Sequence, residues 1–134
     1  MNRWSDWWAQ SLRDLAHAQH ALDAADCEWA SFAAQQSAEK ALKALIMALG
    51  GEPWGHLTAG LVEALPPAAA ATPAVLDAAR RLDKHYIPSR YPNGFAASYP
   101  GKLYTQGEAE HAIADAAIVA EFCRRHLPGQ DSAD

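Results

Sequence analysis

The chain has 134 residues and a formal net charge of −5, and half of its residues are apolar. This length is enough for one domain with its own hydrophobic core. The sequence contains no apolar run long enough to cross a bilayer, and residues 1–6 lack the apolar core of a signal peptide. We therefore predict a cytoplasmic protein that does not enter a membrane, with Cys27 and Cys123 as small core residues rather than a disulfide.

Apolar residues recur at helical spacing along most of the chain, and alanine, the best helix former, dominates the apolar composition. The predicted helices cover residues 4–25, 27–49, 56–65, 73–84 and 105–126. Asp26 is the expected N-cap of the second helix, which stops at Gly50 and Gly51. Thr72 and Pro73 are typical of an N-cap and a first helical residue. We predict an all-α, up-and-down bundle of four long helices plus one short helix.

This bundle is predicted to occupy residues 1–127, and a polar tail covers residues 128–134. On the second helix we expect Gln35 and Gln36 to make contacts between helices or between two copies of the chain. Lys40 and Lys43 are expected on a solvated face.

His56 is expected to cap the short third helix or to bond a neighbouring backbone group. Since it has no cysteine or carboxylate at ligand spacing, we predict no metal site there, and we predict no cofactor.

Basic and aromatic residues concentrate between the fourth and fifth helices. Residues 80–102 hold five basic residues and one acidic residue, a net charge of +4, so the rest of the chain carries −9. Prolines 88, 92 and 100 exclude a continuous helix here. Cations bind phosphate and aromatic rings stack on bases, so this composition favours a phosphate or nucleotide ligand. The candidate ligand-binding residues are Arg81, Lys84, Tyr86, Arg90, Tyr91 and Asn93.

The turn around Arg90 and Tyr91 permits two interpretations. Its backbone amides can surround an anion, as successive amides do in turns that bind phosphate. Alternatively it is a rigid connection between helices, with Tyr91 packed on the bundle. The residue pattern favours neither, although loops carry functional residues disproportionately.

Three segments together resemble the HEPN domain, a helical nucleotide-binding bundle of higher eukaryotes and prokaryotes. They are Ala34–Leu45 (AQQSAEKALKAL), His56-Leu57 with the leucines that follow, and Leu82–Asn93 (LDKHYIPSRYPN). The resemblance extends from Trp4 to His126. It implies a homodimer, often encoded beside a minimal nucleotidyltransferase, and many such proteins are metal-independent endoribonucleases or toxins of toxin–antitoxin pairs. It also implies that Glu39 and Lys40 hold helices together.

The ribonuclease motif of that family is an arginine followed four to six residues later by a histidine. Arg80 and His85 match this spacing and are the candidate catalytic residues. A histidine can accept the proton of a ribose 2′-hydroxyl, and a guanidinium stabilises the charged phosphorane. Active members often carry a polar residue such as asparagine after the motif arginine, whereas this chain has Arg81.

In members paired with nucleotidyltransferases, a tyrosine near the motif histidine accepts AMP. That pattern leaves one residue between the two side chains, whereas Tyr86 directly follows His85.

The sequence leaves three functional hypotheses open. The first is a protein that binds a nucleotide or RNA and is the partner of a small nucleotidyltransferase. The second is a metal-independent endoribonuclease that uses Arg80 and His85. The third is a structural scaffold in which these two residues are only surface or helix-end groups. The acidic remainder of the chain favours a confined site over a broad nucleic-acid platform.

Overall fold

The protein is described by a computed structural model that covers residues 2–129. Over these residues the chain is all-α and contains no strand. The helices are α1 (Trp4–Asp23), α2 (Cys27–Ala48), α3 (Thr58–Glu63), α4 (Pro73–Asp83), α5 (Pro100–Leu103) and α6 (Gln106–His126), with 3₁₀ turns η1 (Pro67–Ala69) and η2 (Pro92–Gly94). The predicted bundle with four long helices is confirmed. The short helix α5 was not predicted; it begins at Pro100, because proline fits the first turn of a helix.

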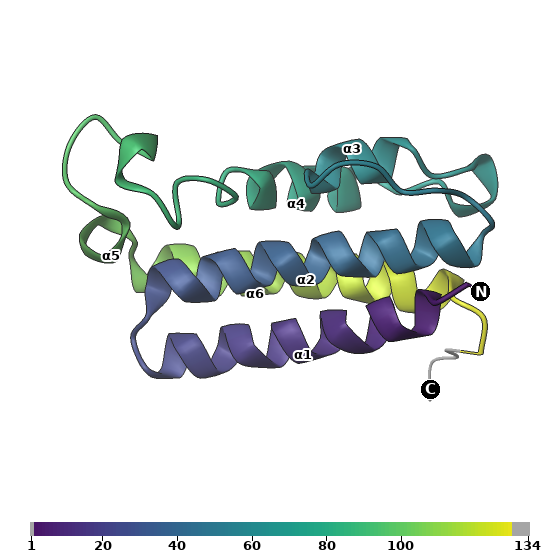
Figure 1. The fold of residues 1–134 in the computed structure, drawn as a ribbon, viewed down its shortest axis with the longest axis horizontal. Helices are drawn as coiled ribbons and strands as arrows, with labels where there is room; N and C mark the ends of the chain where they lie inside the picture. The colour runs from purple at the N-terminus through teal and green to yellow at the C-terminus, as the bar shows by residue number, and fades with distance from the viewer. Residues whose placement is uncertain (1, 130–134) are drawn as a thin grey trace.

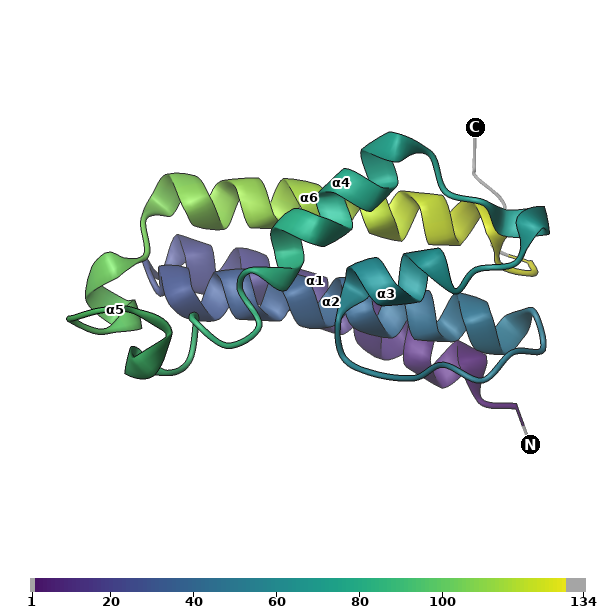
Figure 2. The same cartoon turned by 90° about the horizontal axis from the view of Figure 1, so that it is seen from above.

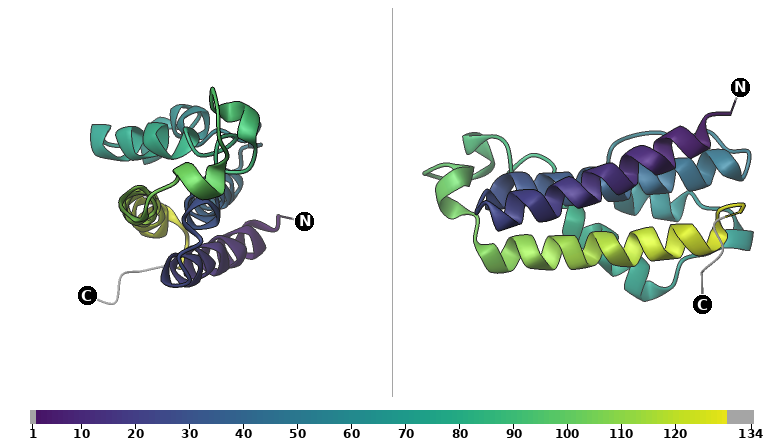
Figure 3. Two further views of the ribbon diagram at one scale, coloured as in Figure 1. Left: turned by 90° about the vertical axis from the view of Figure 1, so that its left-hand side faces the viewer. Right: turned by 90° about the horizontal axis from the view of Figure 1, so that it is seen from below.

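The helices form two layers. The antiparallel pair α1 and α2 lies beside α6, and α3 and α4 cover one side of α2 and α6 (Figures 1 and 2). The connection from α4 to α6, with α5 inside it, projects at the end of the bundle where α6 begins (Figure 1). Figure 3 shows this connection from the end and from below. The basic and aromatic residues identified in the sequence are thereby gathered at one end of the bundle.

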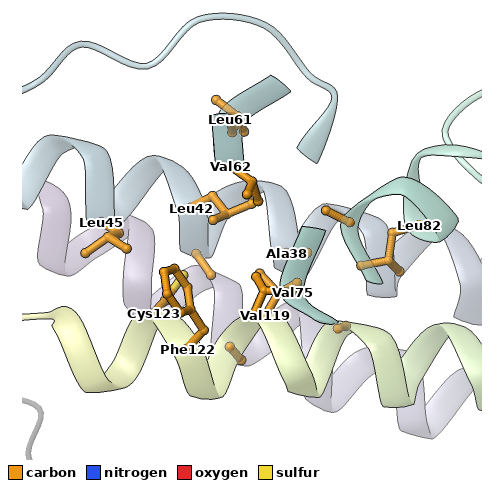
Figure 4. Packing of buried hydrophobic residues seen from close by; sticks show 14 of the residues in the cluster. Ala38, Leu42, Leu45, Leu61, Val62, Val75, Leu82, Val119, Phe122 and Cys123 are labelled. Carbon is orange, nitrogen blue, oxygen red and sulfur yellow. The ribbon is translucent and has the colours of Figure 1, made fainter. Parts of the chain in front are cut away.

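The core lies around α2, which contacts α1, α3, α4 and α6. Large apolar side chains from four helices meet there, as Figure 4 shows for Leu42, Leu45, Leu61, Val62, Val75, Leu82, Val119 and Phe122. Alanines fill much of the remaining contact surface and let the helices approach closely. Each fully buried leucine contributes about 2 kcal/mol to stability. The result is a rigid frame for the loops at both ends.

Two predicted helix starts have different outcomes. The hydroxyl of Thr72 accepts a hydrogen bond from the backbone nitrogen of Val75 at 3.4 Å, which confirms it as the N-cap of α4. Asp26 occupies the predicted N-cap position of α2, although its side chain makes no capping hydrogen bond. The preceding Ala25 has a φ of 62°, and Asp26 itself has a ψ of 68°. The position of the N-cap was thus predicted, and the expected side-chain bond was not found.

The third helix begins two residues later than predicted and is capped by a residue of another helix. Asp83, at the end of α4, accepts hydrogen bonds from the backbone nitrogens of Thr58 and Ala59 at 2.6 and 2.9 Å. The Thr58 hydroxyl donates to the same carboxylate at 2.7 Å. His56 therefore does not cap α3, because Asp83 already satisfies the exposed amides.

No helix within residues 2–129 combines the length and apolar character needed to cross a membrane. Cys27 is half-buried and Cys123 is buried, and both are free thiols, as expected. Most of the predicted polar tail, residues 130–134, lies outside the described residues.

Candidate functional site

A pocket of about 520 Å³ opens where the C-terminal end of α4, the following loop and the first turns of α6 meet. The end of α4 contributes Arg81 and Lys84, and the loop contributes His85, while α6 presents several side chains of one face. The lining residues are Arg81, Lys84, His85, Pro88, Gly94, Phe95, Leu103, Tyr104, Glu108, His111, Ala112 and Asp115. Charged, titratable and aromatic groups therefore surround one cavity, as they do in many ligand-binding sites.

His85 is held in this pocket by Tyr104. Its Nδ1 lies 2.8 Å from the Tyr104 hydroxyl, and the two rings are 5.3 Å apart. Burial lowers the pKa of His85, and Lys84 acts in the same direction, against the opposing effects of Glu108 and Asp115. Burial also raises the pKa of Tyr104, so its hydroxyl stays protonated. When this hydroxyl donates to Nδ1, the neutral imidazole carries its proton on Nε2, where it can donate to a ligand.

Arg81 is fixed by a buried carboxylate of α6. Its Nε and Nη2 donate to the two oxygens of Asp115 at 2.9 and 2.8 Å. The hydrogen bond to Asp115 raises the pKa of Arg81, so the guanidinium stays charged. Nη1 takes part in none of the hydrogen bonds found among residues 2–129. A planar guanidinium held in this way can offer its remaining N–H groups to an anion without rearranging.

The formal charges of the pocket nearly cancel. Arg81 and Lys84 oppose Glu108 and Asp115, and two histidines, His85 and His111, also line the cavity. Phe95 and Leu103 add an apolar wall, and the rings of Phe95 and Tyr104 meet edge to face at 6.3 Å. The pocket therefore combines an apolar wall with charged groups of both signs.

Arg80, the predicted motif arginine, does not line this pocket. Its side chain is 60% exposed, and its Nη1 lies 3.8 Å from Asp77, one helical turn earlier. Because successive helical residues are rotated by about 100°, Arg80 and Arg81 leave α4 in different directions. Within one protomer the structure brings together Arg81 and His85, and it does not bring Arg80 into the same cavity.

Tyr86 and Arg90 lie on the other side of the same loop, against α2. The Arg90 guanidinium packs 4.3 Å from the ring centre of Phe32 and 4.8 Å from that of Tyr86. Its Nε and Nη2 donate to the Tyr86 carbonyl oxygen at 3.0 and 2.8 Å. Tyr91 is exposed, with its ring 5.1 Å from the guanidinium, so it is not packed into the bundle.

Asn93 lies in η2 and is exposed. Of the candidate ligand-binding residues, only Arg81 and Lys84 line the pocket.

The polar residues of α2 form a second cluster. Lys43, expected on a solvated face, is buried, and its Nζ donates to Glu39 at 3.0 Å. Lys40 pairs with Asp14 of α1 at 2.5 Å, so it does connect helices. Both lysine side chains are less exposed than predicted, because α1 packs along this side of α2.

Among the polar residues of the pocket, sequence reasoning did not assign four to the site: Tyr104, Glu108, His111 and Asp115. Three of them recur at spacings of three and four along α6, which places them on one helical face. This polar stripe was a usable signal. Helical periodicity could not show, however, that the stripe faces His85 rather than solvent.

Comparison with known proteins gives a consistent picture. The family model of the HEPN domain matches residues 4–126 of the chain. Among solved structures, TT1696 from Thermus thermophilus is 42% identical with a TM-score of 0.92, over 95% of this chain and 100% of that one. The archaeal HEPN homologue ST0689 is 37% identical with a TM-score of 0.78, over 93% and 98%. An HEPN domain protein of Thermotoga maritima, tm0613, is 27% identical with a TM-score of 0.73, over 90% and 95%.

No curated protein matches the chain significantly. The family match spans nearly the whole bundle, and each of the three similar structures covers 90% of this chain or more. This chain therefore belongs to the HEPN domain family.

Proposed function

We propose that the protein binds a nucleotide, or a nucleotide of a single-stranded RNA, in the pocket between α4 and α6. One observation carries this proposal: Arg81, Lys84, His85 and His111 surround the same cavity as Phe95 and Tyr104. Arg81 and Lys84 would contact phosphate, and the aromatic wall would pack against a base. Family membership supports the same class of ligand.

The test is binding of uridine monophosphate and of a short RNA, measured by calorimetry and by the ring resonances of the histidines. His85→Gln and Lys84→Ala should each weaken binding about tenfold, because the first removes the ring that Tyr104 orients and the second removes a charged donor. Arg80→Ala should bind as the wild type does, because Arg80 lies outside the pocket. Binding that disappears in Arg80→Ala and persists in His85→Gln would contradict the proposal.

A second candidate, metal-independent ribonuclease activity, is favoured by the two histidines in the pocket. His85 and His111 line the cavity together with Arg81, so one protomer holds an acid, a base and a guanidinium. One imidazole would take the proton of the 2′-hydroxyl as its oxygen bonds to phosphorus. The other would protonate the departing 5′-oxygen, and Arg81 would stabilise the phosphorane. In this arrangement Arg81 takes the role that the motif spacing gives to Arg80.

Ribonuclease activity is tested by cleavage of a mixed single-stranded RNA in EDTA. Wild-type cleavage that is lost in His85→Ala and kept in His20→Ala, an exposed histidine of α1, would support it. No cleavage by the wild type over a range of concentrations would exclude activity of the isolated protein and leave nucleotide binding in place.

We also propose that the protein is a homodimer and the partner of a minimal nucleotidyltransferase in a toxin–antitoxin-like pair. The support for both is family membership. Sedimentation equilibrium tests whether the protein is a homodimer. The nucleotidyltransferase partnership is tested by co-expressing such an enzyme from the same organism and asking whether the two proteins co-purify at a defined stoichiometry.

A further inference from the structure

A buried carboxylate orients an exposed histidine at a distance from the pocket. Glu39 of α2 is 5% exposed and accepts hydrogen bonds from Lys43 Nζ at 3.0 Å and from Gln36 Nε2 at 3.2 Å. His56 Nδ1 lies 3.1 Å from the same carboxylate, in the connection between α2 and α3. A buried carboxylate that already has a lysine and an amide does not need a third partner for its own stability. The contact instead fixes the histidine.

His56 is held from three sides while its free nitrogen faces solvent. Gln35 Nε2 donates to the His56 carbonyl oxygen at 2.9 Å. The imidazole lies nearly parallel to the ring of Tyr86, with ring centres 5.8 Å apart and an interplanar angle of 9°. Its side chain nevertheless remains 64% exposed. Because Glu39 accepts a hydrogen bond from Nδ1–H, Nε2 is the nitrogen presented to solvent.

One cation, Arg90, reaches the ring against which His56 lies. Its guanidinium packs 4.8 Å from the ring centre of Tyr86, on which the imidazole of His56 stacks. Two carboxylates also lie here: Glu39 contacts His56, and Asp83 bonds the backbone of Thr58. Nη1 of Arg90 takes part in none of the hydrogen bonds found in the described part of the chain. The Arg90 guanidinium is therefore the group of this cluster that can contact a phosphate.

Exposed aromatic side chains accompany His56 in the sequence and Arg90 in the structure. Trp54, two residues before His56, is 78% exposed. Tyr91 and Trp29 are also exposed. The ring of Tyr91 lies next to the Arg90 guanidinium. Trp29 contacts the ring of Phe32, and Arg90 packs over that same ring. Exposed rings beside cations are the arrangement on which bases of single-stranded nucleic acids stack.

We propose that this cluster, formed by Glu39, His56, Tyr86, Arg90 and Trp54, is a second contact site for a single-stranded nucleic acid. The proposal rests on the proposed function and extends it. The strand would place one nucleotide in the pocket at His85 and continue over the adjacent Tyr86 to His56. Phosphate would meet Arg90, the ring of His56 would face the strand, and a base would stack on Trp54. Glu39 is a positioning residue, since it acts through His56.

The experiment compares a strand with a single nucleotide. The probes are uridine monophosphate and oligouridylate of about ten nucleotides, a length within the usual footprint of such sites. A deoxyribonucleotide strand of the same length distinguishes RNA from DNA. The variants are His56→Gln, Trp54→Ala and His85→Gln, with His20→Gln as the matched control, and sedimentation of each variant is recorded.

We expect His56→Gln and Trp54→Ala to weaken strand binding about tenfold each and to leave mononucleotide binding unchanged. His85→Gln should weaken both, and His20→Gln neither. In the wild type the strand should shift the ring resonances of both His56 and His85, whereas the mononucleotide should shift only those of His85.

Three results would overturn the inference. If His56→Gln and Trp54→Ala bind the strand as the wild type does while His85→Gln does not, the strand binds in the pocket and the second contact site is refuted. If the wild type binds neither probe, the proposed function and the second site fall together. If Trp54→Ala or His56→Gln changes the sedimentation of the protein but not its affinity for the strand, the cluster is a contact between copies of the chain.

Discussion

His85 and Tyr86 are neighbours in sequence but face different partners: His85 faces the segment that leads into α6, and Tyr86 faces α2. His85 bonds Tyr104 on the side of α6. Tyr86 stacks on His56 and meets Phe32 of α2. The short segment after α4 thus joins two clusters of polar and aromatic residues. Any change in this segment should affect both clusters.

Asp83 should be the most important residue for attaching α3 to α4. Its carboxylate accepts three hydrogen bonds from Thr58 and Ala59. Asp83→Ala should lower the free energy of unfolding by about 2 kcal/mol, because the first amides of α3 lose their partner. Urea denaturation measures this value. Asp77→Ala, an exposed position of the same helix paired with Arg80 at 3.8 Å, should change it by less than about 0.5 kcal/mol. Equal effects of the two substitutions would contradict the capping role.

The buried ion pair of Glu39 and Lys43 should be costly to break. Both side chains are almost fully buried, and Glu39→Ala leaves the lysine without its partner. We expect a loss of about 3 kcal/mol in unfolding free energy, since an uncompensated buried charge is strongly destabilising. Asp6→Ala removes the exposed ion pair with Arg3 and should have almost no effect. A Glu39→Ala protein as stable as the Asp6→Ala protein would show that the pair contributes nothing.

The stability of the protein should depend on the protonation of His85. Burial lowers the pKa of His85 in the folded state, so the unfolded chain binds a proton more readily. The contribution of His85 is therefore fully present above about pH 6.5, the ordinary pKa of histidine, and is lost as the pH falls toward the folded pKa. The measurement is the difference in unfolding free energy between wild type and His85→Gln over this range. His20→Gln should follow the wild type at every pH, and a His85→Gln curve parallel to it would refute the effect.

Gly94 should be required for the shape of the pocket. A Cβ at this position would lie 2.8 Å from Pro88 Cα, and backbone cannot yield as a flexible side chain can. Gly94→Ala should displace the loop and weaken uridine monophosphate binding at least about tenfold, since Pro88 and Gly94 both line the pocket. At Gly107, in α6, an added Cβ meets nothing within 4 Å. Gly107→Ala should raise stability by about 0.5 kcal/mol and leave binding intact. Unchanged binding by Gly94→Ala would show that the loop adapts.

Local sequence signals predicted the helices well where the side chain and the backbone that it bonds are close in sequence. Thr72 with Pro73 marked the start of α4, and the glycines at 50 and 51 marked the end of α2. Asp26 stands at the predicted N-cap position of α2 but supplies no side-chain capping hydrogen bond. The prediction that His56 caps α3 was wrong, because the cap comes from Asp83, 25 residues after Thr58.

The sequence placed the candidate site in the same region as the pocket but named only some of the residues that line the pocket. Composition alone placed the charge and the rings between α4 and α6, and His85 does line the pocket there. The spacing of Arg80 and His85 could not show that Arg81 is the arginine that faces the cavity. That choice depends on Asp115, whose carboxylate is buried against α4 and holds Arg81 in place.

Residue types and their spacing were enough to establish a helical domain of the HEPN family with its basic and aromatic residues at one end. Periodicity and composition depend on residues that are close together in the chain, and the sequence lists those neighbours directly. The packing of the helices settled which groups meet: Arg81 with Asp115, His85 with Tyr104, and His56 with Glu39. A shift of one residue along a helix changes the direction of a side chain by about 100°. Such pairings are therefore set by how the helices pack on one another, and packing involves residues far apart in the chain.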